Sequence, residues 1–152
     1  MEELLPESLL SALEREAEKR GTTPEAVMVE MLLRLANPDE RPRILLEAAE
    51  KSLERGRRLA EKGGDVEALR AAWTAALLAL DSLEPPEEEP GGLERYWRLS
   101  LVAEEKGAPL EAWYAALAAG VAAKSGLDGG RHVEKILELV TDLVEALKRA
   151  QG

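Results

Sequence analysis

The residues best suited to chemistry surround the single histidine of the chain, His132, which follows Gly130 and Arg131 at the expected start of the last helix. A helix N-terminus with free backbone N–H groups and a neighbouring arginine could hold a phosphate or a carboxylate. In the alternative interpretation, Asp128 caps the helix and His132 lies at the edge of the core, one turn before Ile136. Gly130, Arg131 and His132 are therefore the candidate anion site, with a plainly capped helix as the competing explanation.

Two adjacent aromatic pairs, Tyr96-Trp97 and Trp113-Tyr114, have side chains that can stack against a nucleic-acid base. Their helical spacing favours ordinary packing instead, because these positions align with leucines expected in the core. The acidic runs at 87–89 and 104–105 are typical of solvent-facing surfaces.

Familiar catalytic and metal-binding patterns are missing from the sequence. It contains no P-loop, HExxH, EF-hand or GxSxG spacing. Without cysteine it has no disulfide, no thiolate zinc site and no thiol nucleophile. Di-iron bundles use Glu-x-x-His motifs, but the residue three positions before His132 is Gly129. The sequence therefore predicts no catalytic residues, no cofactor and no metal.

The overall charge restricts the class of partner. A formal net charge of −10 disfavours nucleic acids and anionic membranes, since phosphate contacts require clustered Lys and Arg. No apolar run could span a bilayer and no signal-peptide pattern is visible, so we expect a cytoplasmic protein. Asn37 and Gln151 are the only side-chain amides. Scarce amides and abundant Glu and Arg are typical of hyperthermophile proteins, which predicts a thermophilic source.

The elements that must position these residues are predicted to be helices throughout. The apolar residues are mostly Leu and Ala, and their spacing follows the helical period. Gly and Pro punctuate the chain between the periodic segments. We expect helices from Pro6 to Gly21, from Pro24 to before Asn37, and from about Pro42 to Lys62. A fourth helix begins after a cap at Asp65. Three more are expected from Leu93 to Gly107, from Pro109 to about Lys124, and from about 131 to near the C-terminus.

A repeated stretch gives the expected arrangement of these helices. Residues 61–77 and 105–121 align without a gap at an offset of 44, and eight of the seventeen positions are identical. Trp73 then aligns with Leu117, Leu69 with Trp113, and Leu53 with Trp97. This alignment predicts that the two hairpins share a core in which the large aromatic side chains of one lie opposite leucines of the other. We expect an all-α antiparallel bundle of two similar helical hairpins plus a C-terminal helix, with a small N-terminal helix pair. The many small residues of the helix at 109–124 suggest that this helix lies at the centre of the bundle.

The N-terminal stretch LPESLLSALEREAEKRGTTPEAVMVEMLLRLA (4–36) resembles the ribbon-helix-helix pattern. That resemblance implies an intertwined dimer whose paired strands, here 1–5, enter a DNA major groove. Glu2 and Glu3 would repel phosphates, and the segment to Asn37 has eight acidic and four basic residues. Dimerisation is therefore expected and DNA binding is not. The predicted domains are a dimerisation element at 1–37 and a helical bundle at 38–152.

The whole chain resembles the PaREP family of helical proteins from Pyrobaculum-type archaea. The matching segments are LPESLL, PDERPRILLEAAEKSLERG, EALRAAWTAALLAL, AWYAALAAG and VEKILELVTDLVEAL. That family is similar to HEPN bundles, some of which are ribonucleases or partners of minimal nucleotidyltransferases. HEPN nucleases use an Arg separated from a following His by four to six residues, but positions 125–127, where that Arg should stand before His132, are Ser-Gly-Leu.

The sequence thus predicts a non-catalytic protein–protein interaction module that forms a homodimer and binds another protein. Two alternatives are a ribbon-helix-helix DNA-binding regulator and a HEPN-type protein that processes RNA or nucleotides without the usual Arg/His motif.

Overall fold

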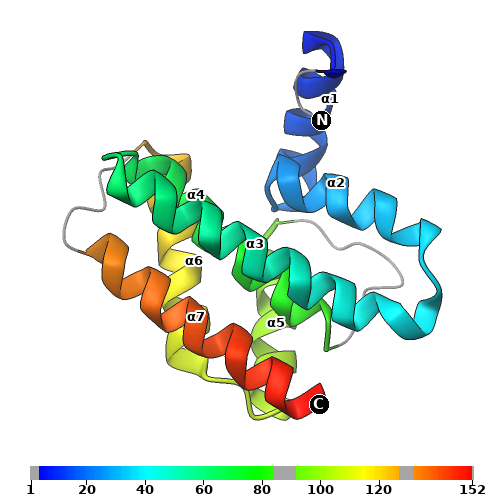
Figure 1. Cartoon of the computed structure of the whole chain (residues 1–152), viewed down its shortest axis with the longest axis vertical. Coiled ribbons are helices and arrows are strands. Elements are labelled where there is room, and N and C mark those ends of the chain that lie inside the picture. The colour runs from blue at the N-terminus through cyan, green and yellow to red at the C-terminus, as the bar shows by residue number, and fades with distance from the viewer. Residues whose placement is uncertain (1–3, 84–91, 127–131, 152) are drawn as a thin grey trace.

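The computed structural model describes residues 4–83, 92–126 and 132–151, and within these ranges the chain is helical with no strand. The all-α prediction is confirmed, and Figure 1 shows the arrangement. The α-helices and short 3₁₀ helices whose bounds fall within these ranges are α1 (Glu7–Arg20), α2 (Pro24–Leu32), η2 (Leu33–Leu35), η3 (Pro38–Glu40), α3 (Arg41–Glu61), α4 (Asp65–Asp81), α5 (Gly92–Glu105), α6 (Leu110–Lys124) and α7 (His132–Gln151).

Local chemistry explains where these helices begin and end. α1 starts after Pro6 and stops at Gly21, which takes the left-handed conformation with φ 67°. Thr23 caps α2 by accepting a hydrogen bond from the Ala26 N–H, and the helix begins at Pro24, as the sequence predicted. The cap of α4 differs from the prediction, because Gly64 holds the cap position and Asp65 is the first helical residue.

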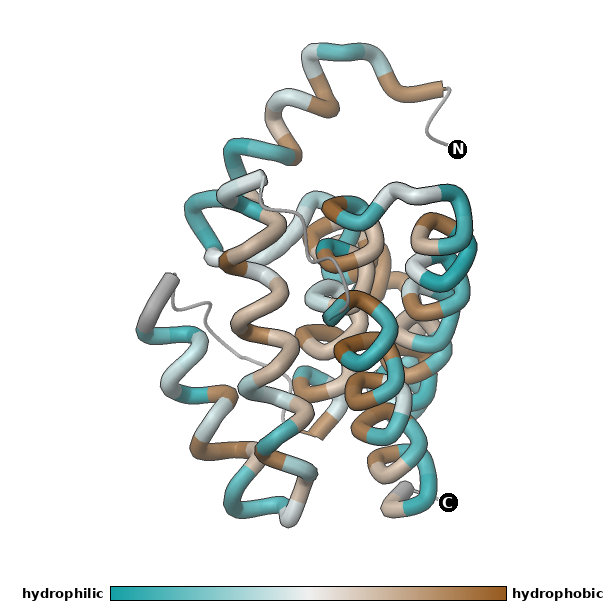
Figure 2. Tube along the Cα trace, turned by 90° about the vertical axis from the view of Figure 1, so that its left-hand side faces the viewer, coloured by the Kyte–Doolittle hydropathy of each residue, from teal (hydrophilic) through white to brown (hydrophobic). Residues whose placement is uncertain are grey.

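The repeated segments form the same local structure twice. Gly63 and Gly107 follow α3 and α5 with φ of 81° and 71°, which closes each helix in a left-handed turn. Glu67 and Glu111 then lie in the first turns of α4 and α6. The predicted architecture of two helical hairpins, α3–α4 and α5–α6, completed by α7, is confirmed (Figures 1 and 2).

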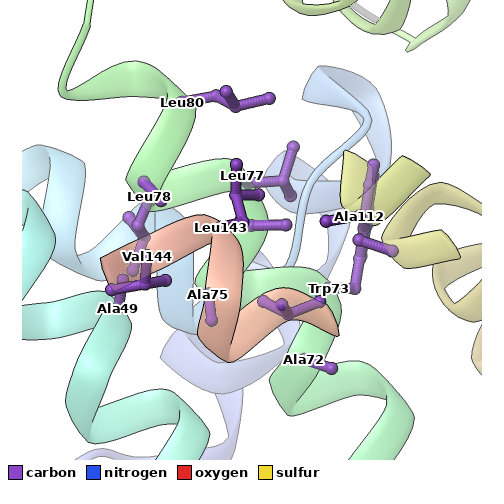
Figure 3. Packing of buried hydrophobic residues seen from close by; sticks show 14 of the residues in the cluster. Ala49, Ala72, Trp73, Ala75, Leu77, Leu78, Leu80, Ala112, Leu143 and Val144 are labelled. Atoms are coloured by element: carbon purple, nitrogen blue, oxygen red, sulfur yellow. The ribbon is translucent and has the colours of Figure 1, made fainter. Parts of the chain in front are cut away.

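The centre of the bundle is α4, and the prediction that the helix at 109–124 is central was wrong. Every residue from Ala71 to Asp81 is buried, whereas α6 leaves Tyr114 and Val121 more than half exposed. Figure 3 shows Leu77 and Leu78 of α4 beside Leu143 and Val144 of α7. α4 has neighbours on all sides because α3, α6 and α7 surround it, and small residues alone do not decide that position.

The N-terminal helix pair is attached to the bundle through α2. The Thr23 hydroxyl lies 2.6 Å from the Thr74 hydroxyl of α4, and Glu25 pairs with Arg70 at 2.9 Å. α1 instead projects away from the bundle (Figures 1 and 2). Ala17 is its one buried residue, while Leu9 is 50% exposed. The leucine side of α1 therefore lacks the cover that its sequence pattern predicts.

Candidate functional site

A groove with a volume of about 540 Å³ lies between the α1–α2 turn and the α5–α6 hairpin. Trp73, Tyr96 and Gly120 contribute to its lining. Both signs of charge are present on its walls. The other charged or polar residues that line it are Glu14, Glu18, Thr22, Thr23, Arg70 and Lys124.

Aromatic packing closes the inner side of this groove. Trp73 stacks on Trp113 with ring centroids 5.4 Å apart and meets Tyr96 edge-on at 5.3 Å. The Trp113 indole N–H donates to the Ser100 hydroxyl at 2.7 Å, which joins α6 to α5. A Cβ added at Gly120 would lie 2.7 Å from a Trp73 ring atom, so only glycine permits this contact. Trp113 is fully buried, so it cannot stack on a ligand.

The two predicted aromatic pairs therefore divide between core and surface. Trp113 is fully buried and Tyr96 is half-buried, which agrees with core packing, and burial raises the pKa of Tyr96. Trp97 and Tyr114 are 69% and 54% exposed. The alignment of Trp97 with buried Leu53 was therefore wrong as a prediction of burial.

The rotation of α5 explains this error. Its buried residues Arg95, Leu99 and Val102 correspond to Ala49, Leu53 and Gly56 of α3 at an offset of 46, two residues more than the repeat. The offset of 44 holds across the turn and the following helix, whereas α5 turns a different face inward.

A buried ionic cluster sets that rotation of α5. Arg95 is 0% exposed, and its Nη2 lies 2.8 Å from Asp81 Oδ2 and 2.9 Å from Glu30 Oε1. Arg98 approaches Asp81 at 3.9 Å, and Arg20 approaches Glu30 at 3.8 Å. The cluster therefore connects α1, α2, α4 and α5. An arginine so deeply buried requires such charged partners.

Asp81 has an unusual acidity within this cluster. Burial raises its pKa from 3.8 to about 8, with Glu30 adding to the rise and Arg95 and Arg98 opposing it. Asp81 therefore holds a proton more readily than an exposed aspartate does, although it lies beside the Arg95 guanidinium. Asp81 is 2% exposed at its side chain and does not line the groove, so no substrate reaches it there. We interpret the cluster as structural.

The candidate anion site is only partly within the described residues. His132 is the first residue of α7 and is exposed, and its neighbour Val133 enters the core instead. Gly130, Arg131 and Asp128 lie outside the described residues, so the anion site and its alternative stay predictions. The acidic run at 104–105 is exposed, and the run at 87–89 also lies outside that part of the chain.

The strand expected at 1–5 from the ribbon-helix-helix resemblance is also only partly within the described residues. Leu4 and Leu5 do not form a strand, and positions 1–3 are outside the described residues. Among the described residues, no three His, Cys, Asp or Glu side chains are grouped so that they could hold a metal ion.

Sequence reasoning missed both the groove and the ionic cluster. The groove combines residues from α1, α4, α5 and α6, which no local pattern brings together. A signal for the cluster did exist, because Arg95 and Leu99 are four residues apart and share a helix face. Asp81 directly follows a continuous apolar run, and an acid is unusual at such a position unless a basic side chain is buried beside it.

Over the described ranges, no helix is both long and apolar enough to cross a membrane. The chain matches no protein-family model, no curated protein and no solved structure.

Proposed function

We propose that this protein is a non-catalytic helical interaction module that forms a homodimer through its N-terminal helix pair and binds another protein through a helical face. The PaREP resemblance is part of this proposal and adds no enzymatic role to it.

The observation that carries the proposal is the position of the exposed large apolar side chains. Within the described residues, nine such side chains lie on only two parts of the molecule, and none is on α3, α4 or α7. Contiguous exposed apolar surface on a folded protein marks contact sites. The N-terminal group comprises Leu4, Leu9, Met31, Leu32 and Leu35, and the second group comprises Trp97, Leu101, Tyr114 and Val121.

The N-terminal group supports self-association. α1 projects from the bundle, and Leu9 and Leu35 are 50% and 86% exposed. Half-buried Leu10 and Leu13 continue the same line toward Ala17. Packing this surface against its copy in a second chain would bury leucines that one chain leaves in water, at a gain of roughly 25 cal/mol per Å² of apolar area.

Light scattering coupled to size exclusion tests the proposal. We expect a dimer for the native chain and a monomer for the Leu9→Glu/Leu35→Glu variant, since both side chains are exposed and their replacement leaves the core intact. Leu101→Glu is the matched control, because Leu101 is also an exposed leucine (43%) but belongs to α5. A native monomer over micromolar concentrations would refute self-association.

A further inference from the structure

The outer face of α6 is apolar although it lies in water. Between Glu111 and Lys124 this helix contains no charged residue. Its inner side packs through Ala112, Trp113, Ala116 and Ala119, while Tyr114 and Val121 on the outer side are 54% and 59% exposed. A helix that is apolar on all sides is normally covered on all sides.

α5 adds two more apolar side chains to this surface. The Trp113–Ser100 hydrogen bond places α5 beside α6, and Tyr96 reaches Trp73 from the same side of α5. Trp97 and Leu101 each follow one of these inward residues, and successive helical residues turn by about 100°, so both point away from the core. Trp97 is 69% exposed. Figure 2 shows the α5–α6 hairpin along one edge of the bundle, where another chain can reach it.

The arginines and the acids of this hairpin lie on different sides of it. Its two arginines, Arg95 and Arg98, turn toward Asp81 and are 0% and 28% exposed at their side chains. The four acids of the hairpin are all exposed and outnumber its two exposed lysines, Lys106 and Lys124, so the surface around its exposed apolar side chains is mainly negative. These acids are Glu94, Glu104, Glu105 and Glu111.

We propose that this outer face, defined by Trp97, Leu101, Tyr114 and Val121, binds a basic amphipathic helix of a partner protein. Apolar residues of that helix at i, i+3, i+4 and i+7 would cover the four side chains, and its Lys or Arg residues would meet the surrounding acids. Trp and Tyr are the side chains most often found at the energetic centre of such interfaces. This inference builds on the proposed interaction role and names the partner's chemistry.

The test uses two synthetic helical peptides with the same leucine positions, one with Lys and one with Glu at the remaining sites. Fluorescence anisotropy of the labelled peptides measures binding to the full chain. We expect saturable one-to-one binding of the Lys peptide, no binding of the Glu peptide, and protection of Trp97 from acrylamide quenching, because Trp73 and Trp113 are already buried.

Two pairs of substitutions separate this surface from general attraction to an acidic protein. Trp97→Ala/Tyr114→Ala should weaken the Lys peptide at least tenfold, and so should Glu104→Lys/Glu111→Lys. Glu138→Lys/Glu145→Lys on α7 is the matched charge control, because both glutamates are exposed on a helix without an exposed large apolar side chain. That control should bind the peptide within twofold of the native chain.

Equal weakening by both charge pairs, or equal binding of both peptides, would overturn the inference. Conversion of the dimer to a monomer by Trp97→Ala/Tyr114→Ala would also overturn it, since a second copy would then be the occupant of this face. A dimer that binds no peptide refutes only this inference, whereas a monomeric native chain that binds the Lys peptide refutes only the proposed dimer.

Discussion

Arg95 Nη2 lies 2.8 Å from Asp81 Oδ2, and the arginine side chain is completely shielded from water. The same nitrogen lies 2.9 Å from Glu30 Oε1, so one guanidinium joins α5 to both α4 and α2. A contact of this kind fixes the rotation of α5 because no other orientation satisfies the buried charges. It thereby decides which side chains of the α5–α6 hairpin face outward.

Removal of the Arg95 side chain should therefore destabilise the folded state. We expect Arg95→Met to lower the free energy of unfolding by about 3 kcal/mol, because the Glu30 carboxylate, 11% exposed at its side chain, loses its closest partner. Denaturant unfolding followed by circular dichroism measures this loss. Arg57→Met, which removes an exposed arginine bonded to Thr141, should cost less than about 1 kcal/mol. Equal effects of the two substitutions would contradict a structural role of the cluster.

The stability of the protein should also depend on the titration of Asp81. Its pKa is about 8 in the folded chain and near 3.8 when unfolded, so between these values the folded state binds a proton that the unfolded state has released. The contribution of Asp81 to stability is therefore complete below about pH 4 and is lost as pH rises toward 8, by up to about 1.4 kcal/mol per pH unit.

Unfolding titrations at pH 5, 6.5 and 8 measure this dependence. Asp81→Asn should remove the downward slope because asparagine does not titrate. Asp142→Asn, at an exposed position of α7, should retain it. The same slope in Asp81→Asn as in the native chain would show that another group is responsible.

The close approach of α6 to α4 gives a prediction that runs against helix propensity. Gly120→Ala would normally stabilise a helix by about 1 kcal/mol, but here the added Cβ meets the Trp73 ring at 2.7 to 2.9 Å. We expect a net loss of about 1–3 kcal/mol from overpacking. In a Trp73→Leu background the same change should become neutral or stabilising, and a double-mutant cycle measures the difference. Independent effects of the two substitutions would place the strain elsewhere.

Much of the fold is predictable because its signals are local. Gly21 ends α1, and Thr23 with Pro24 begins α2, through chemistry contained in a few neighbouring residues. The repeated turns at Gly63 and Gly107 are equally local. These features can be read from the sequence because their conformations depend on backbone limits and capping, not on distant partners.

The inward face of α5 could not be predicted in the same way. Hydrophobic periodicity selects Leu93, Trp97 and Leu101, whereas the structure buries Arg95 and Leu99 and exposes Trp97. A buried arginine contradicts the usual pattern of apolar residues inside, and its partners Asp81 and Glu30 lie 14 and 65 positions away. The groove and the outer apolar face follow from that rotation, so periodicity alone did not place them.

The attachment of the N-terminal helix pair depends on a short chain of hydrogen bonds. Thr74 donates its hydroxyl hydrogen to the Arg70 carbonyl at 2.9 Å, so Thr23 must be the donor in the 2.6 Å contact between the two hydroxyls. The Thr23 oxygen also accepts from the Ala26 N–H at 3.3 Å. One hydroxyl therefore caps α2 and fastens it to α4.

Thr23→Ala should lower the free energy of unfolding by about 1–2 kcal/mol, since it removes a helix cap and a buried hydrogen bond together. Thr23→Ser should retain most of the stability because it keeps the hydroxyl. Thr22→Ala is the matched control, since the Thr22 hydroxyl has no hydrogen-bond partner within the described residues. Hydrogen exchange measured by mass spectrometry should show faster exchange in α1 and α2 for Thr23→Ala and unchanged exchange in α7. If Thr22→Ala and Thr23→Ala exchange alike, this hydrogen-bond chain does not hold the N-terminal pair on the bundle.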